Sequence, residues 1–244
     1  MENKKLGILG GMGPFATSVF LDRVISNTQA TKDQEHIDTI VLNHASLPDR
    51  TKAIMDQRGH EFLQSIQPDI ELLEHSGVSN IAIPCNTSHY FYDDMQAMTQ
   101  VNIINMVEST VKYVQTYYGK HSKVAVLATH GTMQSKIYEK ELAKHGLDFC
   151  PVSSDIQNEI MGIIYAVKSD EAFQSDELSH IIHDFIAREK CSCVILACTE
   201  LSCLAIDPVL RKYYVDALDI LVDQSILLSG KNVKQPPVAW TEVL

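Results

Sequence analysis

The chain has 244 residues, of which 45% are hydrophobic and 21% are charged, and its formal net charge is −11. This composition is typical of a globular protein with one large domain or two smaller ones. The negative charge argues against nucleic acid or an anionic membrane as a partner, and an anionic substrate would need a local cluster of Arg or Lys.

Membrane insertion and export are not expected from the sequence. No apolar run approaches the roughly 20 residues of a membrane span. Residues 1–6 lack the apolar core and cleavage site of a signal peptide. Six cysteines in a chain of this length, without an export signal, are expected to be free thiols in a reducing compartment. We therefore expect a cytoplasmic protein.

Apolar strands and helices alternate in the first half of the chain. Pro68 is expected to start or kink a helical segment, because it lacks an N–H donor. A helix carrying Phe91, Met95 and Met98 is expected after Cys85. The pattern predicts strands at 5–9, 38–43, 80–84 and 103–104, a loop at 29–37, and helices from 14, over 52–76 and over 107–118.

The second half repeats this alternation. A short helix is expected to stop at Pro208, and the tail with Pro236-Pro237 is expected to be irregular. The pattern predicts strands at 123–127, 147–152, 193–197 and near 214–215, and helices ending near 145, over 154–168, over 176–189 and up to about 228. Such alternation indicates parallel α/β sheets, and its repetition indicates two similar domains around a pseudo-twofold axis.

Two cysteines follow equivalent predicted strands, Cys85 in the first half and Cys198 in the second. Both are predicted at helix N-termini, where a thiol pKa is lowered. Two cysteines on opposite sides of one carbon, one as a thiolate and the other as a thiol, can remove its proton from one face and return a proton to the other. This arrangement suits racemisation, although a cysteine at a strand end is more often only a packing residue.

The other candidate motifs are weaker. Cys150, Cys191, Cys193 and Cys203 are expected to be buried thiols, and their spacing does not predict a metal site. The turn at 11–16 has the form of a dinucleotide-binding pattern, but the second strand lacks the acidic residue at its tip. His89 and His130 lie near the candidate site and are expected to be structural.

Four motifs in order resemble the cofactor-independent aspartate/glutamate racemase family, and aspartate racemase most closely. They are Gly10-Gly11-Met12-Gly13-Pro14, Pro48-Asp49-Arg50-Thr51, Ile83-Pro84-Cys85-Asn86-Thr87 and Ala197-Cys198-Thr199-Glu200-Leu201. The resemblance implies two four-stranded α/β domains, 1–104 plus about 214–244 and 105–213, because the family's C-terminal helix crosses back to the first domain. It also implies a homodimer and no cofactor or metal.

The resemblance further implies roles for individual residues. Cys85 and Cys198 would be the catalytic pair. Arg50 and Lys168 would hold the distal carboxylate of a dicarboxylic amino acid. Lys168 could instead be an ordinary surface lysine. The remaining substrate contacts would be Met12, Gly13, Asn86, Thr87, Thr129, Thr199 and Glu200.

Two sequence features bear on the substrate. Glu200 stands where glutamate racemases of the cell-wall type carry histidine, which favours aspartate, and the presence of Cys85 predicts that both enantiomers react. The alternatives are a hydantoin racemase, a maleate isomerase, and a dicarboxylate-binding protein that has lost catalysis. A dehydrogenase would require binding of NADH.

Overall fold

The first sheet of the molecule is parallel and built on buried apolar strands. The computed structural model describes residues 4–169 and 176–234. In this part of the chain, β1 (Leu6–Gly10), β2 (Thr39–Asn43), β3 (Asn80–Ala82) and β4 (Asn102–Ile103) pair in the order β2-β1-β3-β4. Ile8 lies opposite Val41 on one side and Ala82 on the other. All five residues of β1 are buried, as a central parallel strand requires.

The second sheet has the same strand order. In the described residues, β5 (Lys123–Ala128), β6 (Asp148–Cys150), β7 (Cys193–Ala197) and β8 (Tyr214–Asp216) pair in parallel as β6-β5-β7-β8. Each sheet therefore places its second strand at one edge and its third strand beside its first. The prediction of two similar four-stranded parallel sheets is confirmed.

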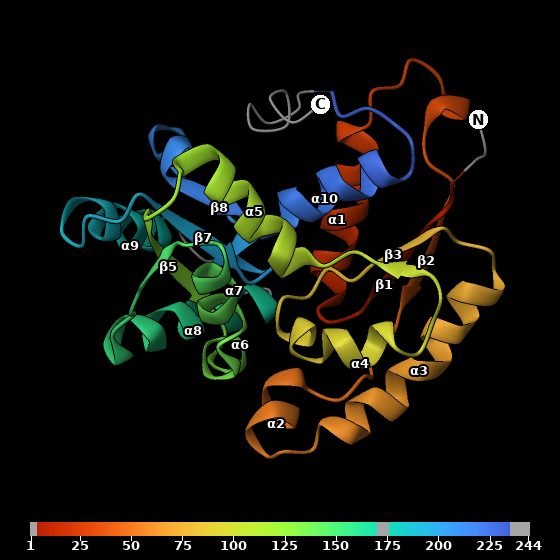
Figure 1. The fold of residues 1–244 in the computed structure, drawn as a ribbon, viewed down its shortest axis with the longest axis horizontal. Coiled ribbons are helices and arrows are strands. Elements are labelled where there is room, and N and C mark those ends of the chain that lie inside the picture. Colours follow the sequence, from red (N-terminus) through yellow and green to blue (C-terminus); the bar gives the residue numbers. More distant parts are fainter. Residues whose placement is uncertain (1–3, 170–175, 235–244) are drawn as a thin grey trace.

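Helices flank both sheets (Figure 1). The first half contains α1 (Pro14–Asn27), η1 (Asp33–Glu35), α2 (Arg50–Met55), α3 (Gly59–His75), η2 (Thr87–Phe91) and α4 (Tyr92–Gln96). The remainder contains α5 (Met106–Tyr118), α6 (His130–Ser135), α7 (Ile137–Lys144), α8 (Ser154–Lys168), α9 (Asp176–Ala187), η3 (Leu201–Cys203), η4 (Pro208–Tyr213) and α10 (Ala217–Leu228).

Several helix boundaries differ from the sequence-based expectation. The helix expected over 52–76 is broken between α2 and α3, and Met98 lies beyond the end of α4. Lys136 adopts φ 58°, which ends α6 and separates it from α7. Pro208 begins η4 instead of stopping a helix, because its fixed φ suits a first helical position. Pro68 lies inside the continuous helix α3. The predicted irregular tail at Pro236-Pro237 lies outside the described residues.

Helix α10 connects the two halves. It leaves β8 in the second sheet and packs against α1 and α5, with its apolar face on the first sheet (Figure 1). Leu218, Leu221 and Val222 join Leu6 and Ile8 in one buried cluster. Strand β8 itself pairs with β7 in the second sheet, and the division of the chain into domains at 104 and about 214 stays a prediction.

Separate apolar clusters lie on the faces of the two sheets. Phe62, Ile66 and Ile70 of α3 are fully buried against the first sheet. Ile160, Ile164 and other residues of α8 and α9 pack on the second sheet. No helix in the described part of the chain combines the length and the apolar character that a membrane span requires.

Candidate active site

Cys85 and Cys198 line one small cavity, and each follows the third strand of its own sheet. Cys85 lies three residues after β3, and Cys198 comes directly after β7. Each is 5% exposed. The cavity has a volume of about 30 Å³, room for roughly one water molecule. An amino acid therefore needs the walls to separate, or needs to reach the thiols from a neighbouring space.

The predicted substrate contacts gather around this cavity. Its lining includes Met12, Arg50, Asn86, Thr87, Thr129, Lys168, Thr199 and Glu200. Gly13 lies in the adjoining chamber, and a Cβ placed there would come within 3.1 Å of Glu200 Oε1. The structure thus brings every predicted site residue to one region, while their roles stay predictions.

Asn86 keeps a free amide donor beside Cys85. Its Oδ1 accepts a hydrogen bond of 2.6 Å from the Tyr138 hydroxyl, which fixes the orientation of the amide. Its Nδ2 is buried and has no hydrogen-bond partner in the described structure. A buried unpaired donor is costly unless a ligand satisfies it. This N–H pair is well suited to a substrate carboxylate.

Three threonine hydroxyls meet between the two halves. Thr87 Oγ1 lies 3.0 Å from Thr129 Oγ1 and 3.0 Å from Thr132 Oγ1, and the last two lie 3.1 Å apart. Thr129 also caps α6, where its side chain accepts from Thr132 N–H. The cluster joins the loop after β3 to the end of β5.

The Arg50 side chain is held by carbonyl oxygens and by no carboxylate among the described residues. Its Nη1 donates to Pro48 O at 3.0 Å, and its Nη2 donates to Met12 O at 3.2 Å. Its Nε is buried without a partner in this part of the chain. The guanidinium charge is therefore oriented but not neutralised, as a site for an anionic group requires.

Lys168 and Cys198 share the carboxylate of Glu200. The Lys168 Nζ lies 3.2 Å from Glu200 Oε1, and the Cys198 thiol donates to Glu200 Oε2 at 2.9 Å. Burial lowers the pKa of Lys168, but nearby Glu200, Cys198 and Cys85 outweigh it and raise the pKa overall. Lys168 therefore stays charged, with much of its charge compensated by Glu200.

The expectation of a lowered Cys198 pKa is wrong. Burial and the neighbouring Glu200 carboxylate raise the pKa of Cys198 well above its usual value. The element that follows, η3, is only three residues long and offers little of a helix dipole. Cys198 is thus a protonated thiol in this structure.

A second chamber adjoins the cysteine cavity. It has a volume of about 320 Å³ and shares Asp49, Arg50, Lys168 and Glu200 with the smaller cavity. Its other walls are largely apolar and include Phe15, Leu47 and Val167. The shared residues form the boundary between the two spaces, so a substrate side chain could extend across them.

The remaining candidates have structural positions. His89 is buried, its Nδ1 contacts Cys85 O and its Nε2 accepts from Met106 N–H, and burial lowers its pKa. Cys150, Cys191 and Cys193 lie in the two cores of the second sheet. Within residues 4–169 and 176–234, no three His, Cys, Asp or Glu side chains come together as metal ligands.

Tyr138 and Thr132 were not predicted to be site residues. Both come from α6 and α7 in the second half and reach across to Asn86 and Thr87 of the first half. No local sequence pattern marks such contacts. Asp49 and Thr51 also line the cavity, and here the motif at 48–51 was the available signal.

Residues 9–224 match the model of the family described as Asp/Glu/Hydantoin racemase. The chain belongs to this family. It is 31% identical over 202 residues to the broad specificity amino-acid racemase RacX of Bacillus subtilis (strain 168), covering 81% of this chain and 86% of RacX. Family and relative together support an amino-acid racemase as the class of enzyme.

Solved structures agree on the fold. Picrophilus torridus aspartate racemase superposes with a TM-score of 0.80 at 27% identity, covering 95% of this chain and 96% of that chain. Glutamate racemase from Francisella tularensis, solved in complex with D-glutamate, gives a TM-score of 0.65 at 17% identity, covering 100% and 92%. At that identity the second likeness concerns the fold alone.

Proposed function

We propose that this racemase interconverts L- and D-aspartate without pyridoxal phosphate, with Cys85 and Cys198 as the two bases. The single observation that carries the proposal is that both thiols line one cavity from equivalent strands of two similar sheets. A protein with one base in each half suits a reaction whose substrate and product are mirror images.

The chemistry follows from placing the α-carbon between the sulfurs. One thiolate removes the α-proton, and the opposite thiol delivers a proton to the other face. For the return reaction the two roles exchange. The free Asn86 amide and the Thr87 and Thr199 hydroxyls would bind the α-carboxylate and stabilise the charge that develops on it.

The distal carboxylate of aspartate would bind Arg50. This guanidinium has no carboxylate partner among the described residues, whereas Lys168 already forms an ion pair with Glu200. Lys168 would serve as a second cation only if it turned from Glu200 toward the substrate. The likeness to Picrophilus torridus aspartate racemase supports this choice of substrate.

A broader substrate range is the second candidate. The apolar walls of the adjoining chamber favour it, and so does the 31% identity to a racemase named for broad specificity. Hydantoin racemisation, maleate isomerisation and binding without catalysis remain alternatives. A panel of aspartate, glutamate, alanine, methionine, a hydantoin and maleate separates these functions by which compound turns over.

Cysteine variants test the proposal. Optical rotation of L-aspartate is followed with the wild type, Cys85→Ser and Cys198→Ser, with reductant and no added cofactor. Each variant is expected to lose at least about a hundredfold in turnover, since each removes one of two acid–base groups. Cys203→Ser is the control, because Cys203 lies outside both cavities. Unchanged turnover in both catalytic variants would contradict the mechanism.

We also propose a cytoplasmic homodimer. The family resemblance suggests the dimer, and the six free cysteines accord with a reducing compartment. Sedimentation velocity at several protein concentrations tests the dimer, and a single monomeric species would overturn it.

A further inference from the structure

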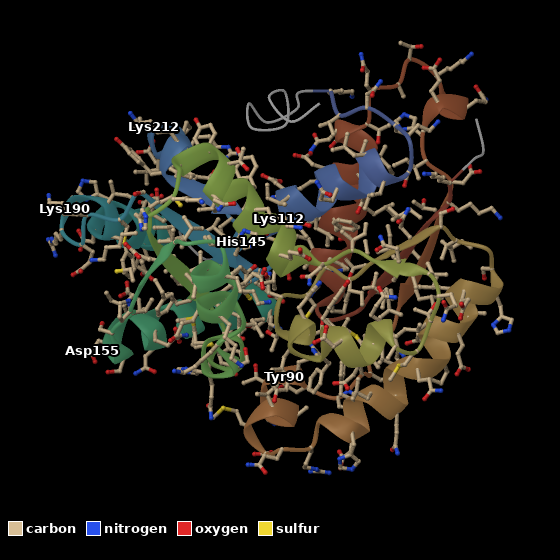
Figure 2. The ribbon with its side chains drawn as sticks, viewed as in Figure 1. Tyr90, Lys112, His145, Asp155, Lys190 and Lys212 are labelled. Carbon is tan, nitrogen blue, oxygen red and sulfur yellow. The ribbon has the colours of Figure 1, made fainter. Side chains whose placement is uncertain are left out.

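A cavity of about 770 Å³ is lined by residues of α5, η4 and α10 and by Asn27 of α1, and neither Cys85 nor Cys198 lines it. It shares no lining residue with the catalytic cavity. Its volume is in the range of small-molecule sites. Lys212, one of the lining residues, lies beside the C-terminal end of α5 (Figure 2). The lining that matters here is Tyr113, Tyr117, Arg211, Asp219, Asp223 and Lys234.

Asp223 places a largely buried carboxylate in this lining. Asp223 is 6% exposed, no other described side chain forms a hydrogen bond or ion pair with it, and the positive charge of Arg211 favours its ionised form only in part. Asp219 differs, because it pairs with Arg23 at 2.7 Å and lies 3.8 Å from Arg211. A buried carboxylate whose charge is only partly compensated is unfavourable, and a ligand with a positive group would stabilise it.

Tyrosine rings form one wall of the cavity. The Tyr113 and Tyr117 rings stack with centroids 5.9 Å apart and planes at 5°. Tyr117 meets Tyr118 edge to face at 4.9 Å. The Tyr118 hydroxyl donates to Lys212 O at 2.9 Å, which ties α5 to η4. Such a wall can pack against another aromatic ring or an organic cation.

Positive side chains lie at the rim. Arg211 is 63% exposed, and its guanidinium lies 5.1 Å above the Tyr214 ring. Lys212 and Lys234 also line the cavity. A simple cation would be repelled by this rim, whereas a molecule with both charges would match it. The combination of a negative interior, a positive rim and an aromatic wall therefore selects a zwitterion with a ring.

We propose that this cavity binds the zwitterion of an aromatic amino acid as a second ligand site. The ammonium group would contact Asp223, the ring would pack on Tyr117, and the carboxylate would face Arg211. The site is independent of the cysteine pair, so it stands whether or not aspartate is the substrate.

Carboxyl NMR on the full chain tests this site directly. The protein is labelled with ¹³C at aspartate carboxyls, Asp223→Asn identifies the resonance, and Asp223 is titrated with and without L-phenylalanine. Without ligand, the Asp219 carboxylate raises the pKa of Asp223 and the Arg211 guanidinium lowers it. The ammonium group of the ligand is expected to lower the apparent pKa of Asp223 further. An unchanged titration up to the solubility limit of L-phenylalanine would overturn the proposal.

Partial ligands and variants separate the contacts. 3-Phenylpropionate lacks the ammonium group and phenethylamine lacks the carboxylate, and both are expected to bind more weakly than L-phenylalanine. Equal binding of 3-phenylpropionate would overturn the Asp223 contact, and equal binding of phenethylamine would overturn the contact at the rim. Asp223→Asn and Tyr117→Leu are each expected to weaken L-phenylalanine binding about tenfold or more. Glu108→Gln, on α5 outside the cavity, is the matched control.

Discussion

The Cys198 thiol donates a hydrogen bond of 2.9 Å to Glu200 Oε2, only two residues along the chain. The same carboxylate holds Lys168 through its other oxygen. Among the described residues, no carboxylate forms a hydrogen bond with the Cys85 thiol. The two proposed bases therefore sit in different electrostatic surroundings, and Cys198 is protonated before a substrate arrives.

Removing the charge of Glu200 is expected to make Cys198 more acidic. In Glu200→Gln the pKa of Cys198 should fall, because the carboxylate that disfavours the thiolate is gone. Rates of alkylation by iodoacetamide, with the modified cysteine identified by mass spectrometry as pH is varied, measure the change. Glu159→Gln on the exposed face of α8 is the control. An unchanged Cys198 profile would contradict the assigned role of Glu200.

Arg50→Lys is expected to impair aspartate more than alanine. Lysine keeps the charge but loses the planar fork and the carbonyl contacts that orient it. The predicted loss in kcat/KM for aspartate is about tenfold to a hundredfold, the scale of one charged hydrogen bond. Steady-state kinetics with both substrates measure the ratio, and Lys52→Gln in the same helix is the control. An equal loss in kcat/KM for alanine would show that Arg50 does not bind the distal carboxylate.

Tyr138→Phe tests whether orientation of Asn86 matters. The change deletes the hydroxyl that donates to Asn86 Oδ1 at 2.6 Å and leaves the ring in the core. Turnover should fall about tenfold, because the amide can rotate away from the substrate carboxylate. Kinetics and urea unfolding are compared on one preparation. A stability loss without a kinetic loss would show that the hydrogen bond serves folding alone.

Gly131→Ala tests the close approach of the two halves. A Cβ at Gly131 would lie 2.8 Å from the backbone Cα of Thr51 in α2. We expect a loss of about 1–3 kcal/mol in unfolding free energy, typical of overpacking. Gly162→Ala in α8 meets no atom within 4 Å and should gain roughly 0.5–1 kcal/mol from helix propensity. Urea unfolding of both variants measures the contrast, and equal effects would contradict the contact.

Asp223 should make stability depend on pH. Burial raises its folded-state pKa from 3.8 to about 7. Its contribution is therefore fully present below the unfolded pKa and is lost as pH rises through about 7. At a pH near the ordinary pKa of aspartate, the free energy of unfolding of Asp223→Asn should match that of the wild type. In mildly alkaline buffer it should exceed that of the wild type by up to about 4 kcal/mol. Urea unfolding of both proteins across this pH range measures the difference in unfolding free energy. A difference that does not change with pH would contradict the prediction.

The strands were predictable from sequence because buried apolar runs are long and bounded by polar residues. β1 and β7 agree with the expectation to within a residue or two. The break at Lys136 was not predictable, since a lysine with positive φ carries no sequence signal. The start of η4 at Pro208 was ambiguous, because proline both ends and begins helices.

The positions of the site residues were predictable only through motifs. Cys85, Asn86, Cys198 and Thr199 stand in quoted motifs, and the structure gathers them in one cavity. Tyr138 could not be predicted, because its contact with Asn86 depends on how the two halves pack. The acidity of Cys198 was misjudged although Glu200 lies two residues away, because burial and a neighbouring carboxylate outweigh a short helical turn.

The measurement that tests the central claim most directly is racemisation of L-aspartate in D₂O, stopped at low conversion. Both the product and the recovered substrate are analysed for α-deuterium by mass spectrometry after chiral separation. Two separate bases predict D-aspartate that carries deuterium and recovered L-aspartate that still carries hydrogen. Deuterium in the recovered L-aspartate, or hydrogen retained in the D-aspartate, would contradict the assignment of one base to each face.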